Sequence, residues 1–443
     1  MATNNVADIV QHSRISKIAF GSCHKNKYAT NVIWNNIVAL QPQAFLWTGD
    51  SIYPPMRGTA PVDMLQREYN SMLTNTTIGY NLLHPPLGIY GIYDDHDWGG
   101  NDVGKDMPNK MERKKAFFDF LGYNDLDNTQ TTGNLARTTL FQRQGAYHSI
   151  DFGPTEQQVK VIFLDTRWFR DNYCIPSVAA SIPFGSGLSC ISRWLTAGLN
   201  LSACFPNGSM LGEQQWTWLQ NELAQSQAKV HIVVSSVQVL TTNPVMESWG
   251  HFPTERNRLL ELLNGIPGTI LLSGDVHHGE ILDLVLPATT DAASNSKHNS
   301  QQYLYEITSS GLTHSCTLPF YGGLCEPLLK TFHHHRIVPD QYYIGKNFGT
   351  IDIDWKQLRV QVNVHDVESG KTVLTTGWKS IHRDRFSPVE LKLLPTVMDG
   401  HLRHIGIMCL LVSLLMSLVI VAWFLWRTSI SPTKKWQKRT KLD

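Results

Sequence analysis

Residue types that bind metal ions follow five apolar runs of the sequence, close to the point where each run ends. Cys23 follows the run 17–20, and Asp50 and Tyr53 follow 44–47. Asp94, Asp95 and His96 follow 88–93, and Asp165 and Arg167 follow 159–164. Asp275 and His277 follow 269–272. In α/β proteins, the loops beyond the carboxyl ends of parallel strands meet at one edge of the sheet. Carboxylate and imidazole groups are ligands of hard and borderline cations. The pattern therefore predicts a metal site at the strand ends.

Each of these residues, taken alone, also has a structural interpretation. Cys23 could be a small buried apolar residue and Tyr53 a packing residue. Asp165 and Arg167 could form a structural ion pair, and 94–96 could be a solvated turn. The functional interpretation is favoured because acidic and imidazole residues follow an apolar run at three separate places.

The spacing of apolar residues predicts a mixed α/β architecture. Apolar residues recur at helical spacing over 31–40, 110–121, 212–224 and 254–263. Further strands are expected at 231–235, 281–285, 303–308, 349–354, 358–365 and 372–376. Helices that alternate with strands, followed by a strand-rich part, predict two β layers covered by helices over residues 15–379.

The C-terminal part contains a long run without charged residues, at 405–426. At about 1.5 Å per residue, a helix of this length spans roughly 33 Å, which matches a hydrocarbon core of about 30 Å. We therefore expect one transmembrane helix over 405–426, with a stalk over 380–404 before it and a basic tail over 427–443 after it. A buried core helix is the alternative, but such helices are seldom so long and so free of charge.

The six Lys and Arg residues of the tail predict the orientation of this helix. Positive flanks collect on the cytoplasmic side, so we expect the tail in the cytoplasm and the large domain in the lumen or outside the cell. The first residues lack the pattern of a secretory signal, so this orientation requires a start upstream of the given sequence. The opposite orientation, with the domain in the cytosol, stays open.

Cysteines and glycosylation sequons indicate an oxidising compartment. Two groups of cysteines lie in expected loops, namely Cys174, Cys190 and Cys204 in a loop insertion over 171–210, and Cys316 and Cys325. Their pairing does not follow from the spacing. Sequons for N-glycosylation begin at Asn75, Asn200 and Asn207.

The charge balance bears on the partners of the chain. The 38 Lys and Arg residues nearly cancel the 37 Asp and Glu residues. Proteins that bind nucleic acids carry a basic face for the phosphates, so we expect no nucleic acid partner.

The motifs, taken together, resemble the PhoD-like alkaline phosphatases of the calcineurin-like metallophosphoesterase superfamily. The matching segments, in the family's order, are FGSC at 20–23, GDSIY at 49–53, YDDHD at 93–97 with Asn101, LDTR at 164–167 and GDVH at 274–277, and WGHFP at 249–253 also looks like the family. The resemblance covers roughly residues 15–366. It implies a four-layer α/β/β/α sandwich.

The resemblance implies a binuclear or trinuclear metal centre. Asp50 would bridge the metal ions, while Cys23, Tyr53 and His277 would ligate a ferric ion. The ligands of calcium or another divalent ion would be Asp94 or Asp95, Asn101 and Asp275.

Two departures from the family's pattern leave parts of this assignment open. The superfamily's histidine after the fifth strand is replaced by Ser235-Ser236-Val237-Gln238, which makes Gln238 a candidate contributor. The acidic motif also leaves the choice among Asp94, Asp95 and Asp97 open.

The resemblance further implies a metal-dependent hydrolase with a phosphate monoester or diester as substrate. A metal ion would lower the pKa of bound water to supply hydroxide. Arg167 would bind phosphoryl oxygens through its planar guanidinium, with Arg170 as a second candidate. His96 would protonate the leaving group or orient the phosphate. The tryptophans expected to shape the substrate pocket are Trp98, Trp168 and Trp249.

Two alternatives stand beside this interpretation. A catalytically inactive metal-binding membrane ectodomain, acting as a receptor or adhesion module, would have lost ligands, yet only the superfamily histidine is missing. A closer relation to purple acid phosphatases is disfavoured, because the Gly-Asn-His-Glu motif of that family is missing and Cys23 is foreign to it.

Overall fold

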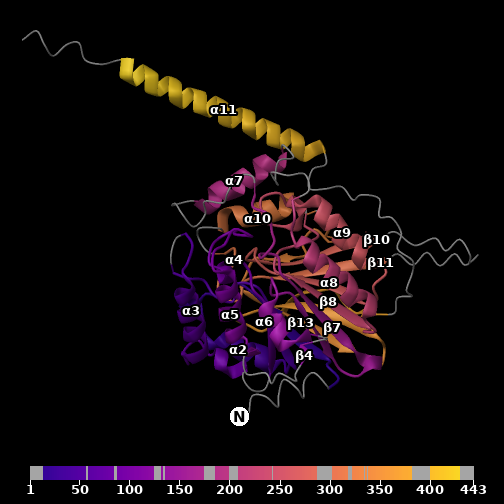
Figure 1. Cartoon of the computed structure of the whole chain (residues 1–443). Coiled ribbons are helices and arrows are strands. Elements are labelled where there is room, and N and C mark those ends of the chain that lie inside the picture. The colour runs from indigo at the N-terminus through magenta and orange to yellow at the C-terminus, as the bar shows by residue number, and fades with distance from the viewer. Residues whose placement is uncertain are drawn as a thin grey trace, which may run out of the picture.

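The computed structural model describes residues 13–55, 58–83, 87–123, 131–132, 135–173, 185–198, 208–241, 243–286, 302–317, 322–333, 335–336, 338–381 and 400–429. Two β-sheets and the helices around them form a mixed α/β fold, as the sequence predicts (Figure 1). Within 15–379, each predicted strand and helix is present, with bounds that differ by at most two residues. The end of the domain at 379 stays a prediction.

The first sheet has the strand order β15-β14-β13-β1-β2-β3, and β16 also pairs with β14. Its strands are β1 (Lys17–Gly21), β2 (Ala44–Thr48), β3 (Gly88–Ile92), β13 (Asn347–Asp354), β14 (Arg359–Asp366), β15 (Thr372–Thr375) and β16 (Lys379–Ser380). Strand β2 pairs in parallel with both β1 and β3, so that Trp47 lies opposite Gly21 and Gly91. The carboxyl ends of these three strands therefore lie at one edge of the sheet.

The second sheet has the order β12-β10-β11-β9-β8-β7-β6. Its strands are β6 (His148–Phe152), β7 (Val159–Leu164), β8 (Val230–Ser235), β9 (Thr269–Ser273), β10 (Gly279–Leu286), β11 (Gln302–Ser309) and β12 (Tyr342–Tyr343). The four central strands β7, β8, β9 and β11 run parallel to one another. Their carboxyl ends also share one edge.

Successive residues of the second sheet pack on opposite faces, as the pleat of a strand requires. Along β7, Val161 and Phe163 belong to the core shared with the first sheet. Ile162 and Leu164 belong instead to a core that contains Trp216. This alternation explains why β7 is a continuous apolar run: both of its faces are covered.

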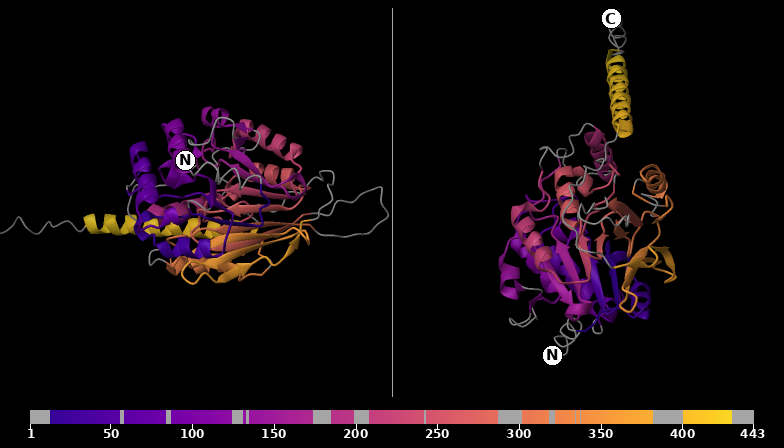
Figure 2. Two further views of the ribbon diagram at one scale, coloured as in Figure 1. Left: turned by 90° about the horizontal axis from the view of Figure 1, so that it is seen from below. Right: turned by 90° about the vertical axis from the view of Figure 1, so that its right-hand side faces the viewer.

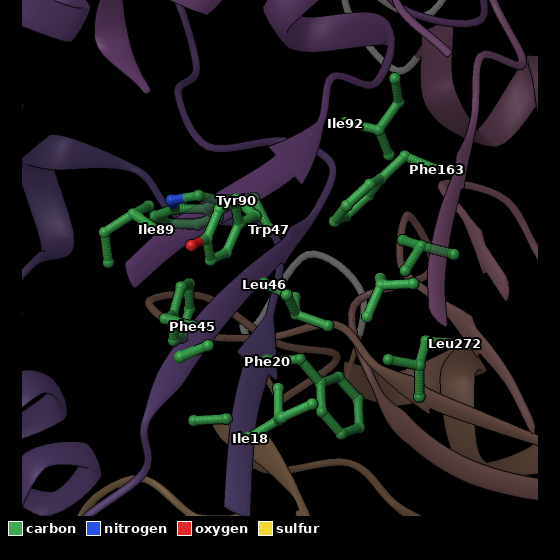
Figure 3. Close-up of a cluster of buried hydrophobic side chains, with 14 of the residues drawn as sticks. Ile18, Phe20, Phe45, Leu46, Trp47, Ile89, Tyr90, Ile92, Phe163 and Leu272 are labelled. Carbon is green, nitrogen blue, oxygen red and sulfur yellow. The ribbon is translucent and has the colours of Figure 1, made fainter. Parts of the chain in front are cut away.

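The two sheets pack against each other through the larger of these cores. Figure 3 shows Phe20 and Ile92 of the first sheet on the side that faces Phe163 and Leu272 of the second, and all four side chains are fully buried. Burial of one such side chain contributes about 1.5–3 kcal/mol. This packing holds the carboxyl edges of the two sheets in register with each other.

Helices complete both cores. The longer ones are α2 (Asn31–Ala39), α3 (Val62–Thr74) and α5 (Lys110–Phe120) against the core shared by the sheets, and α8 (Gly212–Gln225) and α9 (Pro253–Leu263) against the other core. The shorter elements are α4 (Asp95–Trp98), α6 (Arg137–Gln142), the 3-10 helices η1 (Asn26–Tyr28), η2 (Tyr80–Leu83), η4 (Thr155–Gln157) and η5 (Trp249–His251), and the strand pair β4 (Thr131–Thr132) and β5 (Leu135–Ala136).

Some elements differ from the sequence-based expectation. The predicted loop insertion 171–210 contains α7 (Gly185–Gly198), and the glycine-flanked segment after 321 contains α10 (Gly322–Thr331). Glycines and an internal proline disfavour such helices by about 1–3 kcal/mol per residue, so the sequence alone indicated loops. Tertiary contacts override this preference: Cys325 of α10 forms a disulfide with Cys316, with the Cα atoms 5.9 Å apart.

The remaining cysteine and sequon predictions are only partly covered by the structure. Cys190 is not in a disulfide. Asn75 is exposed at the end of α3, where a glycan could be attached without displacing the core. Cys174, Cys204, Asn200 and Asn207 lie outside the described residues.

The C-terminal helix α11 (Gly400–Ser429) extends away from the body of the molecule (Figure 2). Among the described residues, no helix is both long and apolar enough to cross a membrane. The predicted transmembrane helix, and with it the predicted membrane location and orientation, is therefore wrong for the part of the chain that the structure describes.

Candidate metal centre

The candidate site lies where the loops after β1, β2, β3 and β9 meet. Gly274 follows β9, and its backbone touches the loops of the first sheet: a Cβ at this position would lie 2.5 Å from Ser22 Oγ and 2.7 Å from Thr48 O. Ser22 also forms an isolated parallel bridge with Ser310, which follows β11. Glycine at 274 therefore allows the carboxyl edges of the two sheets to come together.

Four of the predicted ligands have a left-handed backbone. The φ angles are 60° at Cys23, 51° at Asp50, 70° at Asp275 and 61° at His277. Residues other than glycine adopt this conformation rarely, and such strained residues cluster at functional sites. The chain therefore turns sharply just after each strand.

Four carboxylates form a compact group at this place, which we call the acidic cluster: Asp50, Asp94, Asp95 and Asp275. Each can place one oxygen within 4.8 Å of the others. Asp94 Oδ2 and Asp95 Oδ1 are buried without a hydrogen-bond partner. Leaving such atoms unsatisfied costs free energy, which a coordinated cation would offset. The residues present therefore fit a metal centre.

The pKa values in the acidic cluster support this assignment. Burial raises the pKa of Asp50 well above its usual value, and the nearby Asp95 and Asp94 raise it further. Burial also raises the pKa of Asp94 to about 7, although Arg167 opposes the shift. Four ionised carboxylates at this spacing repel one another, and a bound cation removes that repulsion.

Asp97, the third candidate of the acidic motif, has a structural role. It accepts hydrogen bonds from Ser51 N at 3.1 Å, Ser51 Oγ at 2.5 Å and Tyr69 Oη at 3.0 Å. It also accepts one from Asp94 N at 3.0 Å, as part of a capping box at the start of α4. Because its oxygens face these donors, Asp97 ties the loop after β2 to α4, and Asp94 and Asp95 are the better ligand candidates.

Cys23 and Tyr53 converge on one oxygen of Asp50. Tyr53 Oη donates to Asp50 Oδ2 at 2.5 Å, and Cys23 Sγ lies 3.6 Å from the same oxygen. Cys23 is buried and is not in a disulfide. Burial and the neighbouring Asp50 raise the pKa of both Cys23 and Tyr53. A thiol, a phenol and a carboxylate at this spacing make a coherent donor set for one metal ion.

Three imidazoles surround the Tyr53 ring. The ring centroids of His96 and His314 lie 4.0 Å and 4.6 Å from it, and that of His277 lies 6.2 Å away. His96 N donates to Asp50 Oδ1 at 3.2 Å. Burial lowers the pKa of all three imidazoles, to about 4 for His277, so they are neutral near pH 7.

Sequence reasoning did not find His314. It follows β11 in the segment Ser309-Ser310-Gly311-Leu312-Thr313-His314. The same signal as at the other sites, a glycine and a metal-ligand residue type just after a strand, could have identified it.

Arg167 and Arg170 are held by a residue that sequence reasoning also missed, Glu247. Arg167 Nη1 and Nη2 donate to the two carboxylate oxygens of Glu247 at 2.8 and 3.1 Å, and Arg167 Nε donates to Asp94 Oδ1 at 2.5 Å. Arg170 Nη1 lies 3.5 Å from Glu247 Oε1. Despite burial, these two cations lower the pKa of Glu247, so it stays ionised.

The structure brings Asn101 close to the acidic cluster. The next residue, Asp102, donates its backbone N–H to Asp95 Oδ2 at 2.6 Å. Asn101 and Asp102 also line a cavity of about 240 Å³ that reaches Tyr173. The role of Asn101 as a metal ligand stays a prediction.

Trp249 and Gln238 lie elsewhere. Trp249 is fully buried, and its Nε1 donates to Ser235 Oγ at 3.0 Å. Gln238 Nε2 donates to Glu280 Oε2 at 2.8 Å and to Thr308 Oγ1 at 2.9 Å. These contacts give both side chains a role in packing the second sheet.

A second group of metal-ligand residue types consists of His278, Cys316 and Cys325. The two sulfur atoms are joined in a disulfide. Disulfide sulfurs are not thiolates, which are the form that ligates metals, so this group does not make a metal site.

The comparisons with known proteins agree with the fold. A family model described as PhoD-like phosphatase matches residues 89–364, more than half of the chain. The class of protein is therefore a metal-dependent phosphoesterase. The chain belongs to the PhoD-like phosphatase family.

Two solved structures align with the chain, and the first of them is similar in fold. A structure of PhoD aligns with a TM-score of 0.53 and 15% identity, over 84% of this chain and 69% of PhoD. A purple acid phosphatase from yellow lupin (Lupinus luteus) seeds aligns with a TM-score of 0.43 and 9% identity, over 82% of this chain and 54% of the other. Among curated proteins, no sequence matches the chain.

Proposed function

We propose that the chain hydrolyses phosphate esters at a centre of two or three metal ions held by the acidic cluster. The observation that carries this proposal is the set of carboxylate oxygens from the loops after β2, β3 and β9, two of them buried without a partner. Two packed sheets with helices against their cores also fit the four-layer sandwich of metallophosphoesterases.

The donor types suggest two kinds of metal ion. Asp50 would be shared between them. A ferric ion suits Cys23, Tyr53 and His277, whereas calcium or another divalent ion suits the oxygen donors, which are Asp94, Asp95, Asn101 and Asp275. When bound, the ions would activate water and polarise the phosphoryl oxygens.

His96 is proposed to orient the phosphate by donating a hydrogen bond to one of its oxygens. Its backbone N–H is fixed on Asp50 Oδ1, while its side chain stays partly exposed beside Tyr53. The side chain can therefore reach a substrate that enters from solvent. Its lowered pKa leaves a neutral imidazole, which donates a hydrogen bond through one nitrogen only.

For Arg167, the geometry supports an indirect role better than a direct phosphate contact. All three nitrogens of its guanidinium already donate to carboxylates. We propose that Arg167 orients Asp94, so that Oδ1 is occupied and Oδ2 is presented to a metal ion. Such outer contacts typically change metal affinity by about 10- to 100-fold. Arg170 would act one step further away, through its contact with the same Glu247.

The second candidate function is a metal-binding module without turnover. The donor set argues against it, because only the superfamily histidine is missing from it. It predicts stoichiometric metal binding with no hydrolysis of any phosphate ester.

The test uses the full-length chain, stripped with a chelator and reloaded with iron and calcium together or separately. Hydrolysis of an aryl phosphate monoester and of a bis-aryl diester is then measured beside the metal content. We expect turnover that depends on metal and is lost in Asp50→Asn. Full metal content without turnover on either ester would contradict the proposal and favour the second candidate.

A further inference from the structure

Lys25 lies at the candidate site on the loop after β1, two residues beyond Cys23. Its Nζ lies 5.8 Å from the centroid of the Tyr53 ring and 5.7 Å from that of the Tyr28 ring. Among the described residues, no carboxylate lies within ion-pair distance of Lys25. The ammonium group is therefore held beside a proposed metal ligand by aromatic faces rather than by an acidic partner.

The loop that carries Lys25 is fixed to the loop after β11. Lys25 N donates to Thr313 Oγ1 at 2.7 Å, and Thr313 Oγ1 donates to Cys23 O at 3.3 Å. Thr313 N also donates to Cys23 O at 3.4 Å. Thr313 therefore fixes the backbone at Lys25. The next residue, His314, packs its ring on Tyr53.

The two arginines near the site are already engaged with a carboxylate. Glu247 neutralises Arg167 and lies against Arg170. The rings of His96 and His314 pack on Tyr53, with their centroids 4.0 and 4.6 Å from that of the Tyr53 ring. Lys25 is therefore a positive charge beside Tyr53 that, among the described residues, has no carboxylate within ion-pair distance.

We propose that Lys25 binds a non-bridging oxygen of the phosphoryl group and makes the site favour phosphate monoesters over diesters. This inference rests on the proposed function and names its substrate class. A monoester carries close to two negative charges near pH 7, because its second pKa is about 6, whereas a diester carries one. An ammonium donor in a partly desolvated site gains more from the doubly charged group.

The experiment compares Lys25→Gln with Lys27→Gln in the metal-loaded full-length chain. Lys27 is a matched control, since its Nζ lies 5.5 Å from the Tyr28 ring, with no contact to Tyr53 among the described residues. Two quantities are measured: the Kd of inorganic phosphate by calorimetry, and the ratio of kcat/KM for an aryl monoester to that for a diester. Lys25→Arg tests whether charge alone restores both.

We expect Lys25→Gln to weaken phosphate binding by about 10- to 100-fold, the range for a lost charged hydrogen bond. The monoester-to-diester ratio should fall by about tenfold on the same scale, with metal content unchanged, while Lys27→Gln behaves like wild type. Equal phosphate affinity and an equal ester ratio in Lys25→Gln and Lys27→Gln would overturn the inference and leave the proposed function intact. A wild type that binds phosphate through Lys25 but hydrolyses no ester would instead overturn the proposed function.

Discussion

Arg167 and Glu247 form a bidentate ion pair that is closed to solvent. The two hydrogen bonds measure 2.8 and 3.1 Å, and the side chains are 0% and 1% exposed. The remaining donor, Arg167 Nε, reaches Asp94 Oδ1 at 2.5 Å. A residue that the sequence did not single out is thereby linked, through one guanidinium, to the acidic cluster.

Replacing Glu247 by Gln should lower both stability and metal affinity. The change removes the bidentate carboxylate partner of the buried Arg167, and the loss of one partner from a buried pair costs about 3–5 kcal/mol. It also frees Arg167 to turn away from Asp94. We expect a lower free energy of unfolding in chelator, measured by urea titration, and a weaker second metal site, measured by metal titration.

Glu306 provides the matched control for that substitution. It is fully buried as well, and it accepts hydrogen bonds from Val239 N at 2.8 Å and Leu240 N at 2.6 Å. Glu306→Gln should leave metal affinity unchanged. An equal loss of metal affinity in both variants would show that the effect of Glu247 is a general loss of packing.

Asp50→Asn should abolish activity but increase the stability of the metal-free protein. The amide cannot be shared between two metal ions, so metal binding and turnover should both be lost. The metal-free variant should nonetheless be more stable than metal-free wild type, by on the order of 1 kcal/mol, because a repelling charge is removed and Asn tolerates a left-handed φ.

Asp97→Asn is the contrasting variant, because it places an amide opposite the donors from Ser51 and Tyr69. It should be less stable than wild type. Thermal unfolding in chelator distinguishes the two. A metal-free Asp50→Asn protein that unfolds below wild type would count against a repulsive cluster.

Tyr53→Phe should remove or shift a visible absorption band of the iron-loaded protein. The reason is that a phenolate bound to a ferric ion absorbs by ligand-to-metal charge transfer, and Tyr53 Oη already lies 2.5 Å from Asp50 Oδ2. Tyr69→Phe is the control, since Tyr69 is equally buried but hydrogen-bonds to Asp97. An iron-loaded Tyr53→Phe protein with the wild-type spectrum would exclude Tyr53 as a ligand.

The stability difference between Glu306→Gln and wild type should depend on pH. Burial raises the pKa of Glu306 from 4.5 to about 7. The folded protein therefore holds this proton more tightly than the unfolded chain, and the stability that the proton contributes is lost as pH rises from about 4.5 to about 7. Gln does not titrate. The free energy of unfolding of the variant should therefore rise relative to that of wild type as pH increases through this range, by on the order of 3 kcal/mol at most. Urea titrations at pH 5 and pH 8 measure the difference, and a difference that is the same at both would contradict the assignment.

The sequence predicted the two-sheet architecture well because the signal for it is local. Strands such as β7 and β8 are short runs in which nearly every residue is apolar, and helices such as α9 repeat apolar residues at a 3.6-residue period. It also found the residues of the acidic cluster, since each follows an apolar run after a sharp turn. α7 and α10 were missed because their glycines, and Pro327 in α10, locally resemble loops.

What the sequence determined by itself was therefore the set of strand ends and the residue types placed there. It could not decide which of Asp94, Asp95 and Asp97 faces the cluster, because that depends on Ser51 and Tyr69, which come from other elements. Nor could it find Glu247, His314 or the position of Lys25, since these lie next to Arg167 and Tyr53 only after the two sheets pack. Hydrogen bonds and charges act over a few ångströms, whereas these residues are separated by tens to hundreds of positions along the chain. Only the tertiary structure brings them within that range.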